Sequence, residues 1–359
     1  MTADPSTPKR KLSWWQFVVP LLVLVLLFGV VLPQFIDYAA VWAAITSLDA
    51  QAVLLLLAMG VFSSWLEAGV YTTLIPGLGL LPGWKAWLGG NSVAGFAPSP
   101  WDIVVRYAMY RGFGVDGSVA GSSVIVGGGF QVTFAILAPL VVLVGLVATG
   151  HGEQPARVFT ALAVAAVVGA VIVISLILRR ERLARAIGRG LQRAADWAMP
   201  RFKREPPPDL ETSTVEFRDL LIKTLASHWW ISALFLFGSH TVKFLGMLFI
   251  FRELGISPEV VPFLELVGVY AIGIFMSLMP IVPAGLGLVE LTYVWLIAGD
   301  DPALADLVAA AAFTHRIFFW LLPIIIGLVP LLGWIRGGGK MSGIAVDQGL
   351  SSPTNPAGE

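Results

Sequence analysis

The chain has 359 residues, of which 57% are hydrophobic and only 13% carry a charge, and its formal net charge is zero. Because so few polar side chains cannot cover the surface of a water-soluble domain, the composition excludes one and predicts a polytopic membrane protein. Cysteine is absent, which excludes disulfides and thiolate chemistry, and the four histidines are too scattered to predict a metal site. We expect neither a metal nor a cofactor.

Apolar stretches of about 20 residues, the length needed to cross a bilayer, recur along the chain. The pattern predicts eight crossings, at residues 17–36, 50–75, 118–149, 158–178, 228–251, 260–280, 286–298 and 303–334. The seventh is short enough to be a half-helix. The predicted fold is therefore all-α, with about eight transmembrane helices and two re-entrant or broken segments.

The basic residues are unevenly placed, and their placement predicts the orientation. They gather at residues 9–11, in the stretch 179–223 and just after the last apolar stretch. With eight crossings all three groups lie on one face, which the positive-inside rule assigns to the cytoplasm. We therefore expect a multi-pass protein of the cell membrane with both termini in the cytoplasm.

Five regions follow from these patterns. They are a disordered N-terminus, a first transmembrane half, a basic amphipathic linker, a second transmembrane half and a disordered tail, at residues 1–14, 15–178, 179–224, 225–335 and 336–359.

The linker carries arginines at helical spacing with apolar residues on the opposite face: Arg182, Arg185, Arg189 and Arg193 against Leu183, Ile187 and Leu191. This pattern predicts a helix that lies on the anionic cytoplasmic leaflet. The alternative is that these arginines only set the topology. Nucleic acid is not an expected partner, because no recognition fold accompanies the basic stripe.

Two segments place prolines, glycines and charges within apolar surroundings, and they contain, in turn, Pro98, Pro100, Asp102 and Arg106, and Pro283, Gly285, Gly287 and Glu290. A lipid-facing helix would not tolerate these residues, because proline removes backbone donors and a buried charge is expensive. Both segments are therefore predicted to be helix breaks that line a polar pathway inside a bundle.

Aligning the two segments without a gap gives four identities: Pro98 with Pro283, Gly114 with Gly299, Asp116 with Asp301 and Ala120 with Ala305. The alignment favours a two-fold internal repeat, and a chance match is the alternative. Interrupted helices at corresponding positions of two halves are typical of a transport site near the middle of the membrane.

Six ionisable side chains are the candidate substrate-binding residues: Glu67, Asp102, Arg106, Glu290, His315 and Arg316. Each lies within an apolar stretch or at a helix break, where an ionisable residue indicates function. Arg316 needs a counter-charge, for which Glu290 or Asp102 is suited, and the resulting pair is either a structural staple or a ligand contact.

The residues Asp102 and Arg106 lie four positions apart, so on a helix they share a face. They either neutralise one another or leave Arg106 to bind a lipid phosphate, for which its planar fork of donors is suited. Glu265 is a further candidate by position. His240 and Lys243 either snorkel or line a cavity, and we assign them no role.

The chain resembles the flippase-like membrane domain of lysylphosphatidylglycerol synthases, as a stand-alone member without the synthase domain. Three motifs carry the resemblance: Pro98-x-x-x-Asp102-x-x-x-Arg106, the run from Pro283 to Glu290, and Arg316-x-x-x-Trp320-x-x-Pro323. Trp101 and Ala284 depart from it, since the family usually has glycine at both positions. The resemblance implies that an anionic or aminoacylated lipid moves between leaflets through a cavity lined by Asp102, Arg106, Glu290 and Arg316. Only residues 337–359 follow the last stretch, so we expect no aminoacyl transfer.

Three functional hypotheses stay open. The first is a flippase or scramblase for an anionic or aminoacylated phospholipid or a polyprenyl-phosphate-linked lipid. The second is a membrane enzyme that modifies a lipid, with Asp102, Glu290 or His315 as acid or base, although no nucleophile–base signature supports it. The third is a non-transporting scaffold for a glycosyltransferase or synthase. The expected partners are membrane lipids, together with either a second copy of the chain or a partner synthase.

Overall fold

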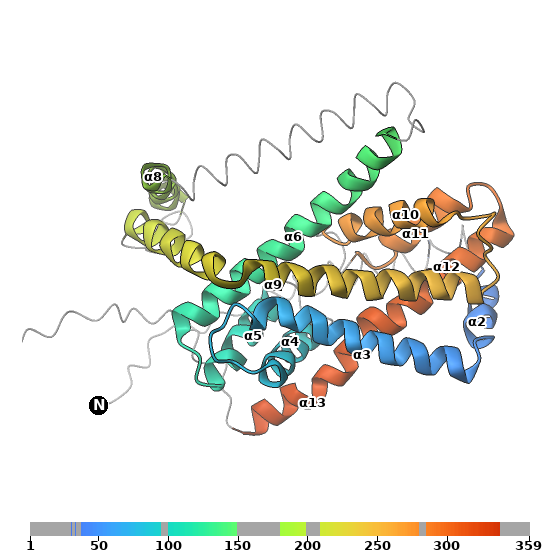
Figure 1. The fold of residues 1–359 in the computed structure, drawn as a ribbon, viewed down its shortest axis with the longest axis horizontal. Helices are drawn as coiled ribbons and strands as arrows, with labels where there is room; N and C mark the ends of the chain where they lie inside the picture. Colours follow the sequence, from blue (N-terminus) through green and yellow to red (C-terminus); the bar gives the residue numbers. More distant parts are fainter. Residues whose placement is uncertain are drawn as a thin grey trace, which may run out of the picture.

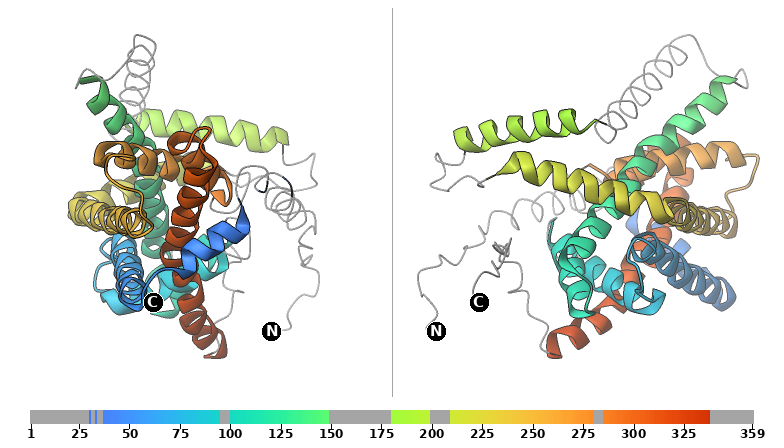
Figure 2. Two further views of the ribbon diagram at one scale, coloured as in Figure 1. Left: turned by 90° about the vertical axis from the view of Figure 1, so that its right-hand side faces the viewer. Right: turned by 60° about the vertical axis from the view of Figure 1, so that its left-hand side comes forward.

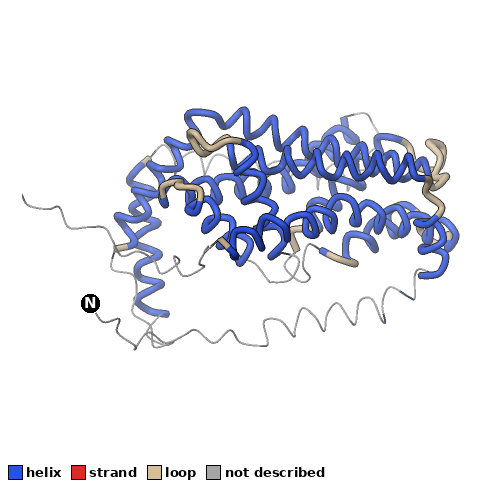
Figure 3. The backbone as a smooth tube through the Cα atoms, turned by 90° about the horizontal axis from the view of Figure 1, so that it is seen from below, coloured by secondary structure: helices blue, strands red, loops and turns tan. Residues whose placement is uncertain are grey.

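The computed structural model describes residues 37–94, 100–148, 180–198, 209–279 and 285–337, together with Val30 and Pro33. Within these residues every regular element is helical, and no strand occurs (Figures 1 and 3). The helices are α2 (Tyr38–Thr46), α3 (Ala50–Thr72), α4 (Leu80–Ala94), α5 (Trp101–Gly112), α6 (Gly117–Ala148), α8 (Glu181–Ala198), α9 (Leu210–Glu253), α10 (Phe263–Met276), α11 (Leu288–Ile297), α12 (Pro302–Arg316), the π-helical turn η5 (Ile317–Leu321) and α13 (Leu322–Arg336). The predicted all-α class is confirmed.

Within the described residues, four helices are long and apolar enough to cross a membrane, namely Ala50–Thr72, Gly117–Val142, Trp229–Glu253 and Pro302–Arg336. They correspond to predicted crossings at residues 50–75, 118–149, 228–251 and 303–334. The last of them runs through α12, η5 and α13 without interruption. The crossings predicted at residues 17–36 and 158–178 lie outside the described residues except for Val30 and Pro33, so the count of eight stays a prediction.

Two pairs of short helices form hairpins. Helices α4 and α5 pack against one another, as do α10 and α11. The longest of the four has 15 residues and so spans roughly 22 Å, well short of the ~30 Å hydrocarbon core. The prediction of a full crossing at residues 260–280 was wrong in length, because Pro262 precedes α10 and a turn from Ser277 ends it after 14 residues.

The long helices α3 and α9 lie side by side and antiparallel (Figures 1 and 2). The hydroxyl oxygens of Thr73 and Ser232 are 2.7 Å apart near one end of the contact, whereas Glu67 meets Lys243 further along. An earlier residue of α3 thus contacts a later residue of α9, as expected for an antiparallel pair of helices.

Each hairpin packs against the distal part of a long helix from the other half of the chain. Helix α4 packs on α13, where the Ser92 hydroxyl donates to the Ile324 carbonyl over 2.7 Å. Helix α10 packs on α6, where a Cβ on Gly268 would lie 3.4 Å from the Val142 side chain. The two halves are thus interlocked rather than stacked end to end.

Buried apolar side chains form two separate cores. One contains α2, the C-terminal part of α9, α10, α11 and α12, with Phe251 and Val308 fully buried. The other contains the C-terminal part of α3, α4, α5 and the start of α6, with Val70 and Met109 at its centre. The polar side chains described below lie between these two cores.

Helix α8 packs on the N-terminal part of α9 (Figure 2). Gln192 accepts a hydrogen bond from the Leu210 amide over 2.9 Å, and Arg189 lies 3.3 Å from Glu211. Leu191 is half exposed on the apolar face of α8. The end of the linker predicted at residue 224 falls inside α9, which continues unbroken for 44 residues.

Candidate functional site

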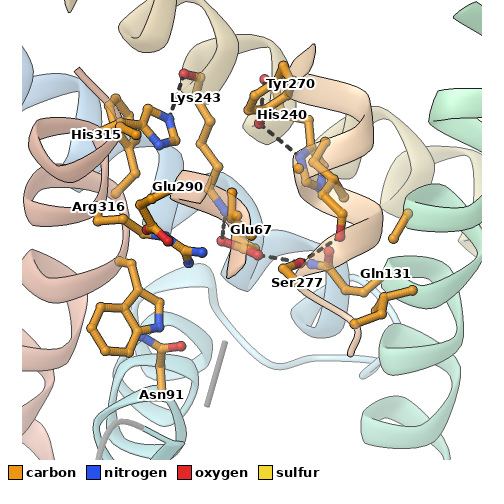
Figure 4. Close-up of a pocket in the computed structure, with 18 of the residues that line it drawn as sticks. Glu67, Asn91, Gln131, His240, Lys243, Tyr270, Ser277, Glu290, His315 and Arg316 are labelled. Atoms are coloured by element: carbon orange, nitrogen blue, oxygen red, sulfur yellow. Dashed lines mark hydrogen bonds and ion pairs between the residues drawn. The ribbon is translucent and has the colours of Figure 1, made fainter. Parts of the chain in front are cut away.

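A cavity of about 350 Å³ lies between the two cores, and all four hairpin helices contribute to its wall (Figure 4). Helices α3, α6, α9 and α12 and the turn η5 complete the wall. Its polar lining includes Glu67, Asn91, Arg106, Gln131, His240, Lys243, Tyr270, Ser277, Glu290, His315 and Arg316. A cavity with a partly polar lining is thus present beside α5 and α11, the helices that follow the two predicted breaks.

Glu290 and Arg316 form a buried ion pair. The Arg316 Nε donates to Glu290 Oε1 over 2.7 Å, and the Gly287 amide donates to Glu290 Oε2 over 2.7 Å. Gly287 and Gly285 have φ values of 78° and 65°, which favour glycine, so the turn before α11 needs both residues. Of the two counter-charges expected for Arg316, Glu290 and Asp102, the structure has Glu290, and the pair connects the turn before α11 to α12.

A second ion pair joins α3 to α9 inside the cavity. Lys243 Nζ donates to Glu67 Oε2 over 2.6 Å, and Gln131 from α6 donates to Glu67 Oε1 over 3.2 Å (Figure 4). Both oxygens of the Glu67 carboxylate are therefore engaged. The sequence predicts no role for Lys243, although an ionisable lysine within an apolar helix indicates function in the same way as Arg316 does.

Arg106 lacks a carboxylate partner among the described residues. Its side chain is 5% exposed, its guanidinium carbon lies 4.4 Å from the centre of the Tyr71 ring, and its Nε has no hydrogen-bond acceptor there. No ion pair within 4.0 Å joins it to a described carboxylate. Arg106 is thus a buried cation on the cavity wall that faces the Tyr71 ring, and Asp102, one turn earlier on α5, acts on it only from beyond ion-pair distance.

The alternative that Asp102 and Arg106 neutralise one another in an ion pair is not what the structure shows. Asp102 lies in the first turn of α5, where the helix dipole favours a carboxylate, and it is absent from the cavity lining among the described residues. Arg106 instead turns toward Tyr71 on α3. Glu265 is likewise outside the lining, in the exposed first turn of α10.

Two histidines line the cavity and stack on aromatic rings. His315 stacks on Phe319, and its Nε2 lies 3.0 Å from the Lys243 carbonyl oxygen. His240 stacks on Phe134 with its Nδ1 3.2 Å from the Tyr270 hydroxyl, while its Nε2 is buried without a described partner. His315 was predicted at the site, whereas His240 was not assigned, because stacking partners on other helices cannot be read from one helix.

The predicted helix breaks are described in part. Pro100 immediately precedes α5, and Gly285 and Gly287 form the turn before α11. Pro98 and Pro283 lie outside the described residues. Within the described ranges, no group of three or more His, Asp or Glu side chains is arranged to hold a metal ion.

The comparisons with known proteins identify the family. The model of the lysylphosphatidylglycerol synthase transmembrane region matches residues 17–327. Because this match spans most of the chain, the protein belongs to that family of helical, multi-pass membrane domains. A UPF0104 membrane protein of Methanothermobacter thermautotrophicus is 41% identical over 81 residues, which are 22% of this chain and 21% of that protein. The matched part is thus about a fifth of that relative.

Proposed function

We propose that this protein is a flippase or scramblase that moves an anionic lipid headgroup across the bilayer through the polar cavity, while the acyl chains stay in the surrounding lipid. The family is compatible with a lipid-related membrane role. The observation that carries the proposal is Arg106, a cation that is buried on the cavity wall and lacks a carboxylate partner among the described residues.

The energetics of Arg106 favour an anionic ligand. Removing an ion from water costs several kcal/mol after relaxation, whereas a desolvated cation–π contact returns about 2 kcal/mol. The Tyr71 ring therefore offsets only part of the cost. Asp102 attracts Arg106 from beyond ion-pair distance and accepts no hydrogen bond from it, so a phosphate or water in the cavity would supply the rest. Arginine also stays charged when desolvated and can donate two parallel hydrogen bonds to phosphate oxygens.

The two hairpins support a pathway that opens alternately to the two faces. Positions 185 apart share local geometry: Gly114 and Gly299 have φ values of 83° and 53°. Asp116 and Asp301 each accept from the amides two and three residues later. Together with the antiparallel α3 and α9, this favours an inverted repeat whose hairpins enter the membrane from opposite faces.

The orientation that accompanies this proposal places both termini in the cytoplasm of a cell membrane. Replacing two full crossings by the α10–α11 hairpin keeps the number of membrane crossings even, so both termini stay on the same side. The basic linker then lies at the cytoplasmic face, where the arginines of α8 would attract anionic lipids with about 1 kcal/mol each near the surface. Exposed Leu191 and Trp197 on α8 would enter the headgroup region.

Reconstitution into liposomes tests the proposal. Acyl-labelled fluorescent phosphatidylglycerol in the inner leaflet is protected from an added quencher until the protein moves it outward. We expect rapid loss of protection with the wild type and roughly a ten- to hundredfold slower loss with Arg106→Gln, because a charge-assisted contact to the phosphate disappears. Arg111→Gln is the matched control, since Arg111 is exposed on the same helix and donates only to the Val115 carbonyl among described groups.

The same assay can also contradict the proposal. If folded wild-type protein moves no anionic lipid, including polyprenyl phosphates, the transport proposal is wrong. A scaffold for a synthase then accounts better for a membrane domain whose ion pairs serve only stability.

A further inference from the structure

The charges around the cavity define which headgroup it can hold. Among its described lining residues, three cationic side chains, Arg106, Lys243 and Arg316, face two carboxylates, Glu67 and Glu290. Both carboxylates are already satisfied. Glu67 accepts from Lys243 and Gln131, while Glu290 accepts from Arg316 and the Gly287 amide.

An ammonium group on a headgroup would therefore meet no available carboxylate. To reach Glu290 it would have to displace both Arg316 and a backbone amide in a site where the Glu290 residue is fully buried. To reach Glu67 it would have to displace Lys243 and leave that ammonium unpaired. Breaking a buried pair in this way is strongly unfavourable, because it leaves an uncompensated charge in a low-dielectric environment.

The buried polar atoms of the cavity lining that lack described partners are nitrogen atoms rather than carboxylate oxygens, so they favour an anion or a hydroxyl. Arg106 Nε is a buried donor of a permanently charged side chain, and His240 Nε2 is a buried ring nitrogen, each without a described partner. Both residues line the cavity and are at least nine-tenths buried. A phosphate satisfies the first, and a hydroxyl, which can donate or accept, satisfies the second in either tautomer.

We propose that the cavity selects a lipid headgroup with one phosphodiester monoanion and free hydroxyls, and rejects headgroups that carry an ammonium group. This inference rests on the proposed function and adds its specificity. Arg106 binds the phosphate, and His240 binds a hydroxyl. An added ammonium group finds no compensating charge there, because both carboxylates are already paired.

Transport selectivity tests the inference. Three acyl-labelled lipids are compared in vesicles of neutral phosphatidylcholine: phosphatidylglycerol, its lysyl ester and phosphatidylethanolamine. We expect phosphatidylglycerol to move at least roughly tenfold faster than the other two, as one charge-assisted contact would produce. Arg106→Gln should slow all three lipids, because each carries the phosphodiester, whereas Lys243→Gln should reduce the preference, because it frees the Glu67 carboxylate. Arg111→Gln should change neither the rates nor the preference. Equal or faster movement of the lysyl ester would overturn the selectivity while leaving lipid transport intact.

A binding measurement separates the two proposals if no lipid moves. Native mass spectrometry of the detergent-solubilised protein compares retention of the same three lipids, with glycerol 3-phosphate as a soluble competitor. Preferential retention of phosphatidylglycerol that Lys243→Gln reduces, with retention of all three lipids weakened by Arg106→Gln, supports the selectivity independently of movement. Equal retention of all three overturns it. Binding of glycerol 3-phosphate in preference to every lipid would also overturn it, because the anion would then be a soluble one.

Discussion

At the residue scale, the part of the site that the structure describes contains two ion pairs and one cation, Arg106, without a carboxylate in hydrogen-bonding contact. The two pairs differ in depth. Glu290 is fully buried and receives a backbone amide as well as Arg316, whereas Glu67 and Lys243 each keep 15% side-chain exposure toward the cavity. The first pair therefore fixes the helix break, whereas the second lies at the cavity surface, where a substitution of Lys243 would present the Glu67 carboxylate to a headgroup.

Removing one partner of the deep pair should be costly. We expect Arg316→Gln to lower unfolding stability by about 3–5 kcal/mol, because Glu290 is left as an uncompensated buried charge. Thermal unfolding in detergent, followed by circular dichroism, measures the change. The double variant Glu290→Gln with Arg316→Gln should recover part of the loss, and a strictly additive double variant would show that the two side chains are not coupled.

Removing Lys243 from the Glu67–Lys243 pair should change which lipid headgroup is transported. Lys243→Gln frees the Glu67 carboxylate toward the cavity, where Arg106 still provides a cation. We expect this variant to move phosphatidylethanolamine faster than the wild type does, by roughly tenfold for one charge-assisted contact. The liposome quenching assay measures both rates. An unchanged preference for phosphatidylglycerol would contradict the role of Lys243 in blocking that carboxylate.

Sequence reasoning located part of this site. The Glu290–Arg316 pair was predictable, because a buried arginine must find a carboxylate and the two helix-break motifs offer few. The pairing of Lys243 with Glu67 was not, since 176 positions separate them and only the packing of α3 on α9 brings them together. The alternative of an Asp102–Arg106 ion pair rested on spacing, which does not specify that Arg106 turns toward Tyr71 on another helix.

At the scale of elements, the last span contains a wide π turn directly after Arg316. The turn η5 joins α12, which packs in one core, to α13, which packs on α4. Gly60 on α3 lies against it so closely that a Cβ would collide with the Phe318 carbonyl oxygen. π turns of this kind occur frequently at functional sites, and here two of its residues, Phe319 and Trp320, line the cavity.

Filling the space at Gly60 should therefore destabilise the turn. We expect Gly60→Ala to lower unfolding stability by about 1–3 kcal/mol through overpacking against backbone that cannot move freely. Gly128→Ala on α6 is the matched control, because a Cβ there meets no atom within 4 Å and alanine favours a helix. Equal melting temperatures for the two variants would show that α3 adapts and that the close approach is unimportant.

The helix breaks were predictable as elements, and their exact extents were not. Both breaks are indicated in the sequence by prolines, glycines and charged residues that lie within apolar stretches. The length of α10 depended on Pro262 and on the turn at Ser277, which a hydropathy pattern does not resolve. The π turn has no sequence signal, since Ile317 and the residues after it read as a continuous apolar helix.

At the scale of the whole molecule, the interlocked halves place the α5–α6 turn and the α11–α12 turn on opposite faces in the proposed topology. The chain has no cysteine, so a single introduced cysteine reports its own location. We expect Asp300→Cys to react with an impermeant maleimide from outside intact cells. Phe113→Cys, at a position that is also exposed, should react only after the membrane is opened. Labelling of both from one side would contradict the inverted arrangement.

The most direct test of the central claim is to see where a headgroup lies. Cryo-electron microscopy of the protein in nanodiscs of phosphatidylglycerol should show phosphate density within hydrogen-bond distance of Arg106, in the cavity between the two hairpins. Arg106→Gln should lack that density while keeping both ion pairs. A cavity that contains only water in the wild type, with every lipid confined to the outer surface, would contradict the claim.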